Sequence, residues 1–146
     1  MILLAAAERA KDISQILGKI RDYDRDESID AATRQLANLH YQLCELDQSI
    51  VARHGVVKNA IFADDLELLQ HSVAYTLQDI WTILGRMPDQ AIGHDYRQAW
   101  KDISFHCRTS RKQSLPVRLE MYSLFAAALV RQLRRYSCLI SSLLFK

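Results

Sequence analysis

Residues 29–50, IDAATRQLANLHYQLCELDQSI, place an apolar side chain on the same side of every helical turn. The apolar positions recur at alternating steps of three and four residues, the spacing of one face of an α-helix. They are Ile29, Ala32, Leu36, Leu39, Leu43, Leu46 and Ile50. This pattern predicts a helix from Ile29 to Arg53, with Ser28 as the residue that caps its N-terminus.

The same periodicity continues in four further stretches. The acidic residues Asp22, Asp24, Asp26 and Glu27 predict a loop before residue 29, and the other breaks contain glycine or proline. These other breaks lie at Gly55, at Gly85, Pro88 and Gly93, and at Pro116. The predicted helices cover Leu3 to Ile20, Ala63 to Leu84, His94 or Asp95 to Cys107, and about 30 residues from Ser114. We expect Gly85 in the left-handed conformation that ends many helices. Residues 108–113 are expected to form a polar connection.

Each stretch has its own apolar stripe, and these stripes are the predicted core. They are Leu3, Ala6, Ala10, Ile13, Leu17 and Ile20; Leu66, Leu69, Val73, Leu77, Ile80 and Leu84; Tyr96, Trp100, Ile103 and Cys107; and Leu119, Tyr122, Ala126, Leu129, Leu133, Tyr136, Ile140 and Leu143. Long stripes joined by short breaks bury their apolar faces by packing on one another. The sequence therefore predicts an all-α, up-and-down antiparallel helical bundle of four to five helices.

Composition agrees with one globular domain over residues 1–146. The chain is 49% apolar and 25% charged, with four glycines and two prolines, which excludes a disordered tail and a collagen-like array. Cys44, Cys107 and Cys138 lie far apart, as expected of reduced thiols rather than a disulfide set. Met1 to Ala7 is apolar but lacks the basic residues of a secretion signal. These features predict a cytoplasmic protein.

Spacings that suggest a metal site occur twice in the sequence. Glu67 and His71 are four residues apart, as are His40 and Cys44. A di-iron site inside a bundle uses Glu-x-x-His pairs and further glutamates on facing helices, and neither pair fits that pattern. We therefore expect no metal, and Glu67 with His71 as a solvated pair on a helix surface.

Catalytic patterns are also missing from the sequence. His106 and Cys107 are adjacent, so on a helix their side chains point about 100° apart and do not form a nucleophile–base pair. The four glycines are scattered and form no phosphate-binding loop. We expect no catalytic residue and no cofactor.

Charge is distributed unevenly along the chain. Residues 1–73 have 8 Lys and Arg against 12 Asp and Glu, whereas residues 74–146 have 11 against 5. Arg131, Arg134 and Arg135 share one side of the last predicted helix, opposite Leu129 and Leu133. This pattern is typical of a core helix, of a helix that binds a protein partner, and of a helix at a membrane surface. The three arginines are the candidate interaction surface.

Four segments carry a resemblance to a known family. The first segments, LLAAAERAKDISQILGKIRDY (residues 3–23) and ATRQLANLHYQLCELDQSI (residues 32–50), resemble the N-terminal helical domain that precedes NACHT or ankyrin regions in fungal STAND (NLR-like) receptors. Residues 64–88 and 96–135 also resemble helical fungal proteins, including uncharacterised ones that carry such a domain alone. The resemblance implies a signalling or protein-interaction module, in some relatives a membrane-active effector bundle. It supplies no site residue, and the chain has neither a nucleotide-binding loop nor repeats.

The sequence thus predicts a non-catalytic intracellular module for signalling or protein interaction. Its expected partner is another protein or a second copy of the chain. Nucleic acid is not expected, because the sequence has no nucleic-acid recognition motif and its pI is only 8.5. One alternative is a membrane-surface effector that uses the basic last helix, with Met1 to Ala7 as a second contact on an anionic membrane. Another is an enzyme or small-molecule-binding protein with an interior pocket lined by His71, Tyr75 or Trp81.

Overall fold

The computed structural model describes residues 2–23, 27–53, 60–111 and 113–144, except for the side chains of residues 2, 23, 60, 108–111 and 136–144. Its secondary structure in these ranges is helical, without strands. The five helices are α1 (Ile2–Tyr23), α2 (Glu27–Ala52), α3 (Ala60–Leu84), α4 (Gly93–Arg111) and α5 (Leu115–Leu144). The predicted all-α bundle is confirmed.

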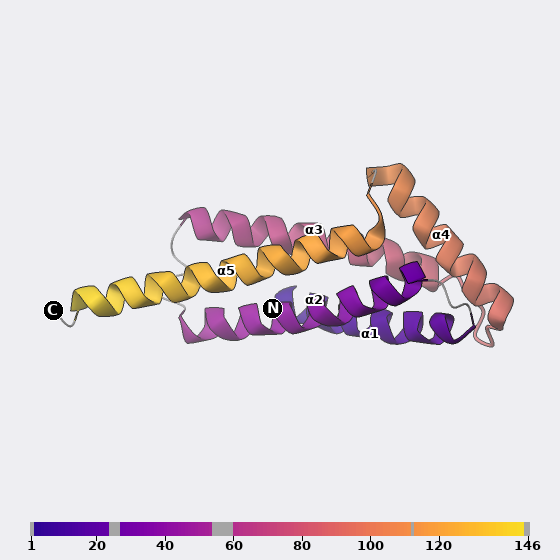
Figure 1. The fold of residues 1–146 in the computed structure, drawn as a ribbon, viewed down its shortest axis with the longest axis horizontal. Coiled ribbons are helices and arrows are strands. Elements are labelled where there is room, and N and C mark those ends of the chain that lie inside the picture. The colour runs from indigo at the N-terminus through magenta and orange to yellow at the C-terminus, as the bar shows by residue number, and fades with distance from the viewer. Residues whose placement is uncertain (1, 24–26, 54–59, 112, 145–146) are drawn as a thin grey trace.

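Figure 1 shows α1, α2, α3 and α5 lying along one another, with α4 crossing one end of the bundle. The chain direction alternates through α1, α2, α3 and α5. Helices α1 and α2 form an antiparallel pair, joined by a bond from Ser14 Oγ to the Thr33 carbonyl (3.2 Å) and one from His40 Nδ1 to the Ala7 carbonyl (2.8 Å). Helix α2 packs on α5, whereas α3 packs on α1, α4 and α5. Consequently α1 and α3 are neighbours that run in the same direction.

The core consists of the predicted stripes. All seven apolar positions of residues 29–50 are buried, and so are the six of α1. In α3, α4 and α5 most predicted positions with a described side chain are buried, while Leu66, Tyr96 and Tyr122 are half-buried at the margin of the core. The side chains of Tyr136, Ile140 and Leu143 are outside the description, and so is Gly55 as a whole. None of the described helices is long and apolar enough to cross a membrane.

Helix ends differ from the predicted bounds in three places. Helix α2 begins at Glu27, so Ser28 lies inside the helix and is not its N-terminal cap. Helix α3 begins at Ala60, which brings Phe62 into the core as a fully buried side chain that the prediction missed. Helix α4 continues to Arg111, and residues 108–111 do not form the expected connection. A polar run without glycine or proline lacks a residue that ends a helix.

The end of α3 also differs in its backbone. Gly85 does not take the expected left-handed conformation, because its φ lies outside the positive range. Its amide still donates to the Trp81 carbonyl at 2.9 Å, as in a regular helix. The Arg86 and Met87 amides then donate three residues back, to Ile83 and Leu84, both at 3.2 Å. This tightened turn, followed by Pro88, ends the helix without a left-handed residue.

Candidate functional site

The side of α5 that faces away from the core carries a stripe of exposed residues with two chemically distinct halves. Its members follow one another at steps of four and three, so they share one face of the helix. We call this set the outer α5 stripe: Val117, Met121, Leu124, Ala128, Arg131 and Arg135.

The first half of the outer α5 stripe is apolar, and its side chains are well exposed. Val117, Met121 and Leu124 keep 48%, 51% and 62% of their surface accessible. Single exposed apolar residues are ordinary on a protein surface, but three on consecutive turns of one helix face form a patch. The sequence pattern at steps of four and three could have revealed this patch, since residues 119, 126 and 133 already define the opposite, buried face.

The second half of the outer α5 stripe is basic, and the structure separates the three predicted arginines. Arg134 lies to one side, where its Nη2 donates to Glu45 Oε1 of α2 at 2.9 Å. Arg131 and Arg135 are exposed and form no ion pair with any residue that the structure describes. The charge that remains available for a ligand is therefore that of Arg131 and Arg135.

The apolar face opposite the arginines lies in the core. Leu129 is 3% exposed and Leu133 is fully buried. At the other end of the chain Leu3, Ala6 and Ala7 are also buried, whereas Leu4 and Ala5 are exposed. Among the described side chains of residues 1–7, a second membrane contact would therefore use Leu4 and Ala5.

The two pairs with a spacing that suggests a metal site lie on different helices, His40 and Cys44 on α2 and Glu67 and His71 on α3. His71 Nε2 is 3.5 Å from Glu67 Oε1, and both side chains are largely exposed, which confirms the solvated pair. The His40 ring must donate through Nδ1 to the Ala7 carbonyl, because a carbonyl only accepts. Within the described part of the chain no three His, Cys, Asp or Glu side chains form a group suited to a metal ion.

The two described thiols are not activated by their surroundings. Cys107 is buried, as predicted for a core position, and burial raises the pKa of its thiol. Burial also raises the pKa of Cys44, whose Sγ lies 4.0 Å from both ring nitrogens of His40. A raised pKa lowers the fraction of thiolate, which is the nucleophilic form. Cys138 lies outside the described side chains.

One polar contact on α4 was not predicted from the sequence. His106 Nε2 lies 3.0 Å from Asp79 Oδ2 of α3, with both side chains about one third to two fifths exposed. The contact ties α4 to α3 beside the buried Cys107. It depends on the packing of helices distant in sequence, so spacing along the chain carries no signal for it.

The residues proposed to line an interior pocket do not converge. His71 and Tyr75 are exposed on the outside of α3. Trp81 is half-buried, and its ring is covered by the Arg9 guanidinium of α1, whose central carbon lies 4.4 Å from the ring centroid. The three side chains therefore do not enclose a common cavity.

Comparison of the chain with protein-family models, with curated proteins and with solved structures finds no match.

Proposed function

We propose that this chain is a non-catalytic cytoplasmic interaction module whose outer α5 stripe binds an amphipathic helix of a partner protein. The observation that carries the proposal is the exposure of Val117, Met121 and Leu124 in line with Arg131 and Arg135. Apolar side chains at consecutive turns favour a helical partner, which presents its own anchors at the same spacing. A signalling or interaction role also agrees with the resemblance to the N-terminal domains of fungal STAND receptors.

The chemistry of the partner follows from the two halves of the outer α5 stripe. The segment from Val117 to Arg135 is about 27 Å long at 1.5 Å per residue, which matches a partner helix of about five turns. The apolar half requires Leu-like or aromatic anchors. The basic half requires Asp or Glu, since Arg131 and Arg135 lack a carboxylate partner among the described residues. The proposed partner is therefore a helix that is apolar at one end and acidic at the other.

A membrane-surface function would use the same helix in a different way. An interfacial helix separates its apolar and basic residues around the helix axis, whereas the outer α5 stripe separates them along the axis. The apolar side that would enter lipid includes Leu129 and Leu133, which are buried against the rest of the bundle. Membrane binding would thus require the bundle to open, and this favours the protein partner.

A selection from a displayed library of helical peptides of about five turns tests the proposal. The enriched peptides should combine apolar anchors at helical spacing with Asp or Glu toward one end. Their affinity should fall about tenfold or more when Leu124→Asp or Arg131→Glu is introduced, and binding to the wild type should weaken at high salt.

Two exposed positions on other helices serve as controls. Tyr41→Asp on α2 and Arg97→Glu on α4 make the same chemical changes away from the outer α5 stripe and should leave binding unchanged. A selection without enrichment, or peptides that bind all variants equally, would contradict the proposal. Cosedimentation with vesicles that contain phosphatidylserine but not with phosphatidylcholine vesicles would instead support the membrane function.

A further inference from the structure

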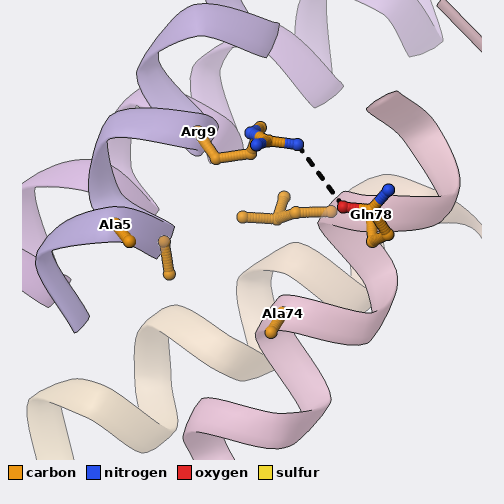
Figure 2. A pocket seen from close by; sticks show the side chains of 6 residues that line it. Ala5, Arg9, Ala74 and Gln78 are labelled. Atoms are coloured by element: carbon orange, nitrogen blue, oxygen red, sulfur yellow. Dashed lines mark hydrogen bonds between the residues drawn. The ribbon is translucent and has the colours of Figure 1, made fainter. Parts of the chain in front are cut away.

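A cavity of about 200 Å³ opens on the surface between α1 and α3. Its lining consists of Ala5, Ala6 and Arg9 from α1 and Ala74, Leu77 and Gln78 from α3. The alanines leave space between the two helices, where longer side chains would fill the groove. Figure 2 shows Ala5 and Ala74 on the two helices, with the Arg9 side chain reaching across toward Gln78.

The Arg9 guanidinium makes two contacts across the helix interface. It stacks on the Trp81 ring, with 4.4 Å from its central carbon to the ring centroid. Its Nη1 also donates to Gln78 Oε1 at 3.5 Å, the upper limit for a hydrogen bond. Stacking occupies a face of the planar guanidinium and leaves N–H groups at its edge for a ligand.

The charge of Arg9 is not balanced by a carboxylate within the described part of the chain. Arg21, Arg34 and Arg134 each pair with an Asp or Glu, at 3.3, 3.5 and 2.9 Å. Arg9, although half-buried, has only the neutral Gln78 and Trp81 as described partners. A fixed and partly desolvated cation beside an apolar cavity is complementary to a ligand with a carboxylate and an apolar group.

The dimensions of the site restrict that ligand further. A cavity of about 200 Å³ is smaller than most small-molecule sites, which enclose about 300–1,000 Å³, and it suits one aliphatic side chain. The apolar lining and the guanidinium belong to one pocket, so both ligand groups must lie close together. The C-terminal residue of a peptide carries a side chain and a carboxylate on the same Cα atom. An internal acidic residue would need a second residue to fill the cavity.

We propose that this cavity binds the C-terminal residue of a partner polypeptide that ends in an aliphatic side chain. The side chain enters between Ala5 and Ala74, and the terminal carboxylate accepts hydrogen bonds from Arg9. The long bond from Arg9 to Gln78 is given up, so that Gln78 Oε1 accepts the backbone N–H of the bound residue. The site lies on α1 and α3, whereas the proposed helix partner uses α5. Neither proposal depends on the other.

Titration of the full chain followed by NMR tests this assignment with short peptides. The probe is acetyl-Ala-Leu with a free carboxylate; acetyl-Ala-Leu-amide lacks the charge and acetyl-Ala-Gly lacks the aliphatic side chain. We expect the free acid to shift the Trp81 indole N–H signal with a dissociation constant on the order of 1 mM, as ligands of this size allow. The other two peptides should bind at least about tenfold more weakly. The indole signal of the buried Trp100 should not move.

Two variants and two matched controls locate the binding. Arg9→Gln removes the charge, and Ala74→Leu fills the cavity from an exposed position; both should abolish the Trp81 shift. Lys11→Gln on α1 and Ala37→Leu on α2 make matching changes at exposed positions outside the cavity and should leave the Trp81 shift unchanged. An unchanged Trp100 signal shows that each variant remains folded.

Three results would overturn the assignment. The first is the absence of a Trp81 shift at about ten times the expected dissociation constant. The second is equal binding of the amide or of acetyl-Ala-Gly. The third is binding of 4-methylpentanoate, which has the carboxylate and the aliphatic group but no peptide N–H, as tightly as acetyl-Ala-Leu; this would assign the cavity to a free carboxylic acid.

Discussion

Leu36 of α2 and Leu133 of α5 are fully buried in the bundle core, whereas Gln48 of α2 is exposed. Leu36→Asp or Leu133→Asp should lower the free energy of unfolding by several kcal/mol. About 2–3 kcal/mol comes from lost apolar burial, and the burial of a carboxylate adds to it. Gln48→Asp should stay within about 0.5 kcal/mol of the wild type. Urea unfolding measures all three, and similar midpoints would contradict the assignment of the core.

The thiol of Cys107 predicts how the stability of the protein depends on pH. Burial raises the pKa of its thiol, Arg118 partly offsets this, and Asp79 adds to it. The folded protein therefore retains the thiol proton at a pH where the unfolded chain, with a thiol pKa of about 8.5, has lost it. Stability falls with rising pH wherever the folded state binds more protons.

The free energy of unfolding should consequently decrease as the pH rises above about 8.5. Cys107→Ala should show a smaller decrease than the wild type, although Cys44, whose pKa is also raised, still contributes. Urea unfolding at a series of pH values from neutral upward measures the difference. Identical slopes for the wild type and Cys107→Ala would contradict the effect of burial at this site.

Helices α3 and α5 are joined by a partly buried hydrogen bond between the hydroxyl groups of Thr76 and Tyr122, at 2.7 Å. Thr76 is only 3% exposed, so Tyr122→Phe leaves a buried polar atom without this partner. The single replacement should cost about 1–3 kcal/mol, and the double variant Thr76→Val/Tyr122→Phe less than the sum of the two singles. A double-mutant cycle from urea unfolding measures the coupling. Additive costs would show that the bond does not stabilise the helix pair.

The helices themselves were largely predictable from the sequence because their signals are local. The steps of three and four in residues 29–50 identify the buried face of α2, and glycine or proline marks the ends of α3 and the start of α5. The errors lie at helix ends. Ser28 and residues 108–111 are compatible both with a helix and with a cap or connection, and their final state depends on neighbouring turns.

Across the molecule, α4 is expected to be the least stable helix. It crosses the end of the bundle instead of lying along it (Figure 1), and the described part of α4 contributes Ala99, Trp100, Ile103 and Cys107 to the core. Helix α2, in contrast, packs on both α1 and α5 and has buried residues from Ile29 to Ile50.

Amide hydrogen exchange should therefore be faster in α4 than in the centre of α2, because local opening requires less free energy where fewer apolar groups are buried. His106→Ala, which removes the contact with Asp79, should accelerate exchange in α4 and leave the centre of α2 unchanged. Exchange measured by mass spectrometry or NMR provides the comparison. Equal protection of α4 and α2 would mean that the molecule opens as one cooperative unit.

The periodicity of apolar residues identified most of the buried side chains and the helical stretches from the sequence, because a helix repeats every 3.6 residues whatever lies beside it. The same pattern does not say which helices are neighbours. The stripes all consist of Leu, Ile, Ala and similar side chains, and any two of them bury comparable apolar surface.

Contacts between residues distant in sequence are therefore decided by the packing of the whole chain. The parallel arrangement of α1 and α3 brings Arg9 to Trp81 and Gln78, and the packing of α2 on α5 brings Arg134 to Glu45. The same packing buries Leu129 and Leu133 and turns Val117, Met121 and Leu124 to solvent. The sequence identified the three candidate arginines. It did not show that Arg134 forms an ion pair while Arg131 and Arg135 do not among the described residues, because that difference depends on which helix packs beside α5.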